Sequence, residues 1–216
     1  MIRQVKICGI STSETMAIAL ANGADFIGLV FYKPSPRNIS IEQARTLADQ
    51  ARGKAKIVAL TVDATDELLQ GIVKAVQPNY IQAHGSETPE RIAQIKRQTG
   101  LPVIKAIKVR DADDVARARP FYSIADIILF DAKAPADLKN ALPGGNGEIF
   151  DWTLLAQTNL PENYMLSGGL DPKNISDAVS GTNAAIFDVS SGVETSPGKK
   201  DVAAIKNFIV AMRNAG

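Results

Sequence analysis

A single cysteine stands at the end of the first apolar run of this sequence. Cys8 closes the run Val5-Lys6-Ile7-Cys8 and is followed by Gly9. Successive side chains of a strand point to opposite faces, so Lys6 and Cys8 share one face and Val5 and Ile7 share the other. A free thiol has a pKa of about 8.5, which a nearby cation lowers, so a thiol at a strand end can exchange a proton near neutral pH. The alternative is a small buried side chain without a chemical role.

Other polar side chains stand where later apolar runs end. They are Arg37, Asp63, His84, Asp131 and Asp188, and His84 is the only histidine of the chain. In parallel α/β folds, ligands bind at the carboxyl ends of the strands, so these side chains are candidates for one shared site. Taken singly, each has a plainer explanation: an aspartate caps the next helix, the histidine bonds to a loop carbonyl, and the arginine is a solvated charge.

Two glycine-containing loops late in the chain give the most specific signal. Glycine lets the backbone approach a ligand and turn its N–H groups inward, and serine adds hydroxyl donors. Barrel enzymes commonly bind phosphate between the loops after their seventh and eighth strands. Two ordinary tight turns are the alternative. The residues that we expect to hold the phosphate are Gly168, Gly169, Ser190, Ser191 and Gly192.

The chain alternates short β-branched runs with longer amphipathic segments, which predicts eight strand-and-helix units. We expect strands at Val5–Gly9, Phe26–Phe31, Ile57–Val62, Tyr80–Ala83, Val103–Ile107, Asp126–Phe130, Tyr164–Leu166 and Ala185–Val189. We expect helices at Thr12–Ala21, Ile41–Ala51, Asp66–Val76, Pro89–Thr99, Asp113–Arg119, Trp152–Ala156, Pro172–Val179 and Lys199–Arg213.

Eight right-handed units of this kind close into an α/β fold, a single-domain (β/α)8 TIM barrel over residues 1–216. An open doubly wound sheet is the alternative, although the GxGxxG sequence that often follows its first strand is absent. One long segment rich in glycine and proline interrupts the pattern between Ala132 and Ile149. Its length predicts either an active-site lid or a disordered insertion.

The composition excludes several classes of protein. The 24 Lys and Arg residues nearly balance the 23 Asp and Glu residues, so we expect no binding to nucleic acid or to a membrane surface. We find neither a signal-peptide pattern nor an apolar run of transmembrane length. One cysteine cannot form an internal disulfide, and one cysteine with one histidine cannot build a His/Cys zinc site. We therefore expect a cytoplasmic protein without a metal, since no spaced acidic cluster indicates a carboxylate–metal site either. The composition does not decide the oligomeric state, for which a monomer or a homodimer is expected.

The whole chain resembles the phosphoribosylanthranilate isomerase family of tryptophan biosynthesis. Two positions depart from the family's pattern, Ala83 where a larger aliphatic residue is usual and Asn146 where threonine is common. The segments that carry the resemblance are Val5–Ile10, Gly28–Phe31 with Ser35–Ser40, Gln82–Gly85, Phe130–Asp131, Gly144–Gly147 with Phe150–Trp152, Ser167–Leu170 and Asp188–Glu194.

The resemblance implies an Amadori rearrangement, which converts N-(5-phosphoribosyl)anthranilate into 1-(2-carboxyphenylamino)-1-deoxyribulose 5-phosphate. An enzyme of this kind is an aldose–ketose isomerase, an intramolecular oxidoreductase, and requires no metal or organic cofactor. An acid must protonate the furanose ring oxygen so that the ring opens, and a base must remove the proton from C2. By the same resemblance, Cys8 is the base and Asp131 is the acid.

The resemblance also implies how the phosphosugar substrate binds. Arg37 takes the anthranilate carboxylate, because its planar fork matches a carboxylate. Asp188 holds substrate hydroxyls or the amine, and His84 lines the pocket. The loops that contain Gly168, Gly169, Ser190, Ser191 and Gly192 take the phosphate.

Two other functions remain open for such a barrel. An isomerase of histidine biosynthesis performs the same chemistry on a larger bis-phosphate, and it calls for two opposed phosphate loops and typically an aspartate base on the first strand. The other possibility is a non-catalytic barrel that only binds a phosphosugar. Cys8 argues against the first, and Cys8 together with Asp131 argues against the second.

Overall fold

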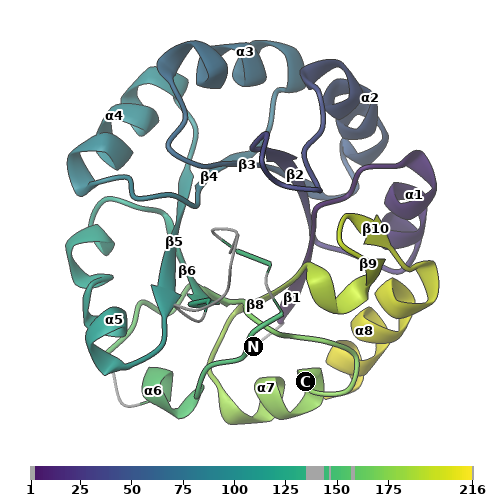
Figure 1. Ribbon diagram of the computed structural model, residues 1–216, viewed down its shortest axis with the longest axis vertical. Helices are drawn as coiled ribbons and strands as arrows, with labels where there is room; N and C mark the ends of the chain where they lie inside the picture. The colour runs from purple at the N-terminus through teal and green to yellow at the C-terminus, as the bar shows by residue number, and fades with distance from the viewer. Residues whose placement is uncertain (1–2, 135–143, 146, 157–158, 216) are drawn as a thin grey trace.

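Eight parallel strands close into a barrel inside a ring of helices (Figure 1). The computed structural model describes residues 3–134, 144–145, 147–156 and 159–215. The strands follow one another around the barrel in chain order, and β8 pairs with β1 to close it, which confirms the predicted (β/α)8 barrel. The strands are β1 Gln4–Cys8, β2 Phe26–Phe31, β3 Lys56–Thr61, β4 Tyr80–Ala83, β5 Val103–Val109, β6 Ile127–Ala132, β7 Tyr164–Leu166 and β8 Ile186–Val189.

The helices cover the outer face of the barrel, and a small hairpin, β9 with β10, lies beside α8 (Figure 1). Among the described residues, no helix combines the length and the apolar character that crossing a membrane would require. The helices are α1 Ser13–Ala21, α2 Ile41–Ala51, α3 Asp66–Val76, α4 Pro89–Thr99, α5 Ala112–Ala116, α6 Thr153–Ala156, α7 Ile175–Gly181 and α8 Val202–Asn214. The 3-10 turns are η1 Arg119–Phe121 and η2 Ser191–Val193, and the hairpin strands are β9 Glu194–Ser196 and β10 Lys199–Lys200.

The strands bury both of their faces, which explains their nearly continuous apolar sequences. Strand β2 is buried at every position. Outward-facing side chains such as Val5 and Ile7 pack into the large core beneath the helices. Inward-facing side chains such as Ile104 and Leu129 fill the barrel itself. Toward the carboxyl ends of the strands these inward positions become polar, and this change creates a site at one end of the barrel.

The predicted helix starts depend on side-chain caps. The Ser40 hydroxyl accepts a hydrogen bond from the Gln43 amide at the start of α2. At the start of α1, the Thr12 hydroxyl accepts one from the Thr15 amide. Each cap satisfies an N–H group that has no partner within its own helix.

Two helix predictions are corrected by local turns. Pro172 lies outside α7 rather than in its first turn, because the Asp171 carboxylate accepts the amides of Lys173 and Asn174 and holds a separate turn there. The segment Asp113–Arg119 is not one helix. Helix α5 ends at Ala116, whose carbonyl would need the N–H that Pro120 lacks, and η1 follows.

The last helix also starts later than predicted. Lys199 and Lys200 belong to the antiparallel hairpin with β9. Helix α8 begins after Asp201, whose carboxylate accepts a hydrogen bond from the Ala204 amide. The hairpin brings Lys200 back toward the barrel, where it becomes part of the site.

Candidate active site

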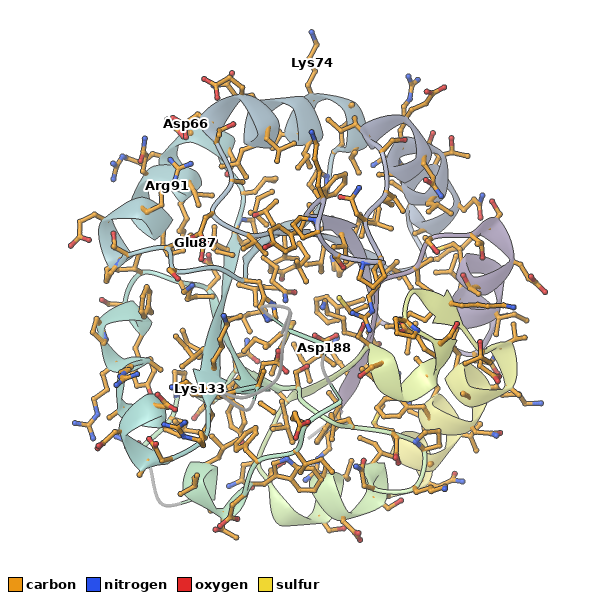
Figure 2. All side chains as sticks on the ribbon, in the orientation of Figure 1. Asp66, Lys74, Glu87, Arg91, Lys133 and Asp188 are labelled. Atoms are coloured by element: carbon orange, nitrogen blue, oxygen red, sulfur yellow. The ribbon has the colours of Figure 1, made fainter. Side chains whose placement is uncertain are left out.

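A pocket opens at the carboxyl ends of the strands. The free space in it, with its opening to solvent included, is about 710 Å³. Figure 2 shows Asp188 pointing into the ring of strands. Gly192 lies just beyond the lining, with its backbone against the Leu170 carbonyl. The predicted site residues that line the pocket are Cys8, Arg37, His84, Asp131, Gly168, Gly169, Asp188, Ser190 and Ser191.

Cys8 lies on the inward face of β1 above a buried ion pair. The Lys6 ammonium, one strand repeat earlier, donates to Asp188 Oδ1 at 2.9 Å, and neither side chain reaches solvent appreciably. Gly28 on β2 leaves room for the thiol, because a Cβ atom there would lie 2.7 Å from Cys8 Sγ. The thiol therefore lies against Gly28 of β2 and within reach of the charges of Lys6 and Asp188.

The charges around Cys8 act on its pKa in opposite directions. Burial raises the pKa of the thiol, Lys6 opposes this, the Asp188 carboxylate adds to it, and Lys200 opposes it. Burial alone would lower the pKa of Lys6, but Asp188 and the thiolate outweigh this and raise it. The net result is a thiol with a pKa above its usual range that has two cations close enough to stabilise the thiolate.

Asp131 and His84 form a second polar group in the same pocket. His84 Nε2 lies 3.1 Å from Asp131 Oδ2, and His84 Nδ1 lies 2.8 Å from Gln82 Nε2. Asp131 has the inward parity of Ile127 and Leu129, both of which pack inside the barrel. A carboxylate and an imidazole in contact can hold or transfer a proton at the barrel mouth.

A buried ion pair beneath His84 holds the turn that follows it. The Lys105 ammonium donates to the Gly85 carbonyl at 2.8 Å and to Glu87 at 2.7 Å. Glu87 in turn accepts hydrogen bonds from the amides of Gly85 and Asp63. Burial by itself would raise the pKa of Glu87, but Lys105 holds it below its usual range. Asp63 thus belongs to this turn and does not line the pocket.

Arg37 is already paired within the protein. Its Nε and Nη2 atoms each donate to one oxygen of Glu194 at 2.8 Å, and Nη2 also donates to the Gly145 carbonyl at 3.2 Å. Lys200 approaches the same carboxylate at 2.8 Å. Burial alone would raise the pKa of Glu194, but Arg37 and Lys200 hold it below its usual range. Of the guanidinium, only Nη1 is left without a hydrogen bond to a described residue.

The two late loops meet at one side of the pocket. Gly168 has φ +91°, and a Cβ atom there would lie 2.4 Å from the Ala132 amide nitrogen, so only glycine fits. The Lys200 ammonium donates to the Ser190 carbonyl at 2.8 Å. The Ser190 hydroxyl donates to the Cys8 carbonyl at 3.2 Å, which ties this loop to β1.

Gly144 and Gly145, in the long segment after β6, also line the pocket. A Cβ atom at Gly144 would lie 2.6 Å from His84 Nε2 and 2.7 Å from Asp131 Oδ2, and one at Gly145 would lie 2.6 Å from Arg37 Nη1. The backbone therefore lies directly against both polar groups. The rest of the predicted lid, residues 135–143 and Asn146, lies outside the described residues.

Four side chains that our sequence reasoning gave no role complete the site: Lys6, Gln82, Glu194 and Lys200. Lys6 and Gln82 could have been found, because each stands two residues before a predicted site residue and so shares its face of the strand. Glu194 and Lys200 lie in the β9–β10 hairpin, which follows the last barrel strand, β8. Nothing local in the sequence indicates which arginine or loop they bind. Among the described residues, no three His, Cys, Asp or Glu side chains cluster as a metal site would.

The fold and the pocket define a (β/α)8 barrel with acidic, basic and thiol groups at its mouth, and comparison with known proteins gives the family. A family model for N-(5'-phosphoribosyl)anthranilate isomerase matches residues 5–211. The isomerase of that name from Mesorhizobium japonicum is 50% identical over 100% of this chain and 97% of its own length. The one from Rhizobium meliloti is 50% identical over 98% of both chains. The chain belongs to the N-(5'-phosphoribosyl)anthranilate isomerase family.

Solved structures agree with this assignment. The phosphoribosylanthranilate isomerase from Thermotoga maritima is 35% identical, with a TM-score of 0.87 over 98% of this chain and 99% of the other. A phosphoribosylanthranilate isomerase in complex with reduced 1-(o-carboxyphenylamino)-1-deoxyribulose 5-phosphate is 34% identical, with a TM-score of 0.85 over the same shares.

The charge arrangement around Cys8 predicts opposite effects of two substitutions. Lys6→Met removes a cation that favours the thiolate, so the pKa of Cys8 should rise further, whereas Asp188→Asn removes an anion and should lower it. The ultraviolet absorbance of the thiolate during a pH titration measures both, since Cys8 is the only cysteine. Cys8→Ala supplies the tyrosine background. Shifts in the same direction, or none, would contradict the arrangement described above.

Proposed function

We propose that this pocket carries out the Amadori rearrangement of N-(5-phosphoribosyl)anthranilate with Cys8 as general base and Asp131 as general acid. The observation that supports this most is that the two side chains, from β1 and β6, line one pocket and are almost fully buried. The chain is an aldose–ketose isomerase of its family, with a small phosphosugar as ligand. The product is 1-(2-carboxyphenylamino)-1-deoxyribulose 5-phosphate.

The reaction begins with two proton transfers, and a tautomerisation completes it. Asp131 gives its proton to the furanose ring oxygen as the bond from that oxygen to C1 breaks, which leaves an iminium between C1 and the anthranilate nitrogen. The Cys8 thiolate then removes the proton from C2, and the electron pair forms the C1–C2 double bond of an enolamine. The enolamine then tautomerises: the C2 hydroxyl loses its proton as the C2 carbonyl forms, and C1 gains a proton, which gives the ketose.

The two glycine-containing loops hold the phosphate. Backbone N–H groups of Gly168, Gly169 and Ser191, or of the adjacent Gly192, together with the serine hydroxyls, offer donors to an anion. Lys200 supports this loop from below through the Ser190 carbonyl. Asp188 uses Oδ1 for Lys6, which leaves Oδ2 to accept a substrate hydroxyl or amine.

Arg37 binds the anthranilate carboxylate through the edge of its guanidinium that faces away from Glu194. That edge carries Nη1 and the second N–H of Nη2, which Gly145 covers here. The carboxylate therefore replaces the Gly145 carbonyl when the substrate binds. Glu194 keeps the other edge of the guanidinium in place throughout.

The proposal extends to the setting of the enzyme. It is a single (β/α)8 domain over residues 1–216, works in the cytoplasm as a monomer or a homodimer, and uses no cofactor. The single cysteine supports a reducing compartment. One solved structure, 33% identical, shows monomers generated from a dimeric phosphoribosylanthranilate isomerase of Thermotoga maritima, so both states occur among the relatives.

Loss of either proton-transfer group should reduce turnover and leave binding almost unchanged. Cys8→Ala and Asp131→Asn should each lower kcat by about 10²–10⁴-fold, because positioned acid–base groups typically contribute that much. Conversion of N-(5-phosphoribosyl)anthranilate by the purified variants measures this, with fluorescence titration of product for binding. A Cys8→Ala enzyme that turns over normally would remove the thiol from the mechanism and make His84 the leading candidate for the base.

The proposed role of Arg37 predicts a defect in KM. Arg37→Ala removes a charge-assisted contact worth about 1.5–3 kcal/mol, so KM should rise roughly tenfold to a hundredfold while kcat changes less. Arg52→Ala is the control, since Arg52 lies at the C-terminal end of α2 beside the start of β3, forms an exposed ion pair with Asp49 and does not line the active-site pocket. Equal KM values for wild type, Arg37→Ala and Arg52→Ala would exclude Arg37 from carboxylate binding.

A further inference from the structure

Behind the acid lies a chain of three buried side chains. Gln82 Nε2 lies 2.8 Å from His84 Nδ1, and His84 Nε2 lies 3.1 Å from Asp131 Oδ2. Gln82 is fully buried, and the other two are at most 5% exposed. His84 and Asp131 line the pocket, whereas Gln82 lies deeper in the barrel and does not. Any effect of Gln82 on the substrate must therefore pass through His84.

The orientation of the Gln82 amide determines which nitrogen of His84 carries the proton. With Nε2 facing His84, Gln82 Oε1 is a buried acceptor without a hydrogen-bond partner among the described residues. The reverse orientation would instead leave the amide NH₂, with its two donors, unpaired among the inward apolar side chains of the barrel. The first orientation leaves one carbonyl oxygen and one N–H without a partner among the described residues, whereas the reverse leaves two N–H groups. An unpaired buried carbonyl is better tolerated than an unpaired buried N–H, so Gln82 donates to His84.

A donor at Nδ1 has a direct consequence for the other end of the ring. Nδ1 must present a lone pair to accept from Gln82, so a neutral His84 carries its proton on Nε2. His84 then donates to Asp131 Oδ2, which becomes an acceptor. No described residue hydrogen-bonds to Asp131 Oδ1.

We propose that Gln82 is a positioning residue for the acid step: it fixes His84 as the Nε2–H tautomer, and His84 thereby confines the transferable proton of Asp131 to Oδ1. A carboxylic acid has one proton and two oxygens that can hold it, and only one of them can face the ring oxygen of a bound substrate. Because Oδ2 accepts the Nε2–H of His84, the proton of the Asp131 carboxylic acid is held on Oδ1. The inference rests on the proposed role of Asp131 as the acid.

The single histidine makes the tautomer directly measurable. Two-bond ¹H–¹⁵N correlation spectra of the labelled protein contain one imidazole pattern, which belongs to His84. We expect wild type at neutral pH to show a protonated Nε2 and an unprotonated Nδ1. In Gln82→Glu at a pH where the new carboxyl group is ionised, the carboxylate can only accept, so Nδ1 should carry a proton, whether His84 becomes the other tautomer or the imidazolium. Both states deprive Oδ1 of its proton.

We expect kcat to fall in the variant in which the protonation of His84 changes. Gln82→Glu should lower kcat at least about tenfold, yet less than Asp131→Asn does, with KM changed little, because the bound substrate does not touch Gln82. Tyr80→Phe is the matched control, since Tyr80 lies on the same strand and packs against the same inner cluster. It should keep both the wild-type tautomer and the wild-type kcat.

Two outcomes would overturn the inference. A wild-type spectrum with a protonated Nδ1 would do so alone, even if Gln82→Glu fails to fold. A Gln82→Glu enzyme with the new carboxyl group ionised and Nδ1 still unprotonated, or with Nδ1 protonated and kcat unchanged, would do so as well. Failure of the proposed function looks different: Asp131→Asn would then retain its activity whatever the tautomer of His84.

Discussion

Burial of charge at the barrel mouth is the constraint on which the rest of the site depends. Lys6 and Asp188 neutralise each other inside the barrel at 2.9 Å, directly beside the Cys8 thiol. Leaving one partner of such a pair uncompensated typically costs about 3–5 kcal/mol, so neither is freely exchangeable. The same low-dielectric setting strengthens every charge that acts on the thiol. A thiolate whose conjugate thiol has a raised pKa is a stronger base. The positive charges of Lys6 and Lys200 limit how far burial raises that pKa.

The second constraint is space, which glycine provides. Gly28 admits the thiol beside β2, and Gly144 brings the backbone against the His84–Asp131 hydrogen bond. If the proposed reaction needs the Cys8 thiolate and the protonated Asp131 at the same time, the pH profile of the enzyme reports the pair rather than either group alone. The closed barrel is what makes this pairing possible, since it places the ends of β1 and β6 around one opening.

Much of this architecture could be predicted from the sequence. The bounds of β2, α2, α3, α4 and β7 agree with the observed ones, because apolar periodicity and capping residues are local signals. The inward parity of Cys8 and Asp131 followed from strand geometry in the same way. The pairing of Arg37 with Glu194 could not be foreseen, since it joins residues 157 positions apart. Pro172 was misplaced because an aspartate turn, not the proline, determines where α7 begins.

A substrate deuterated at C2 distinguishes the proposed roles of Cys8 and Asp131. The measurement is the isotope effect on kcat for wild type and for the Cys8→Ala and Asp131→Asn variants. If Cys8 removes the C2 proton, its loss makes that step fully rate-limiting, and the isotope effect should exceed that of wild type. If Asp131 opens the ring, its loss slows an earlier step, and the isotope effect should fall toward unity. The opposite pattern, or equal isotope effects in both variants, would contradict the account.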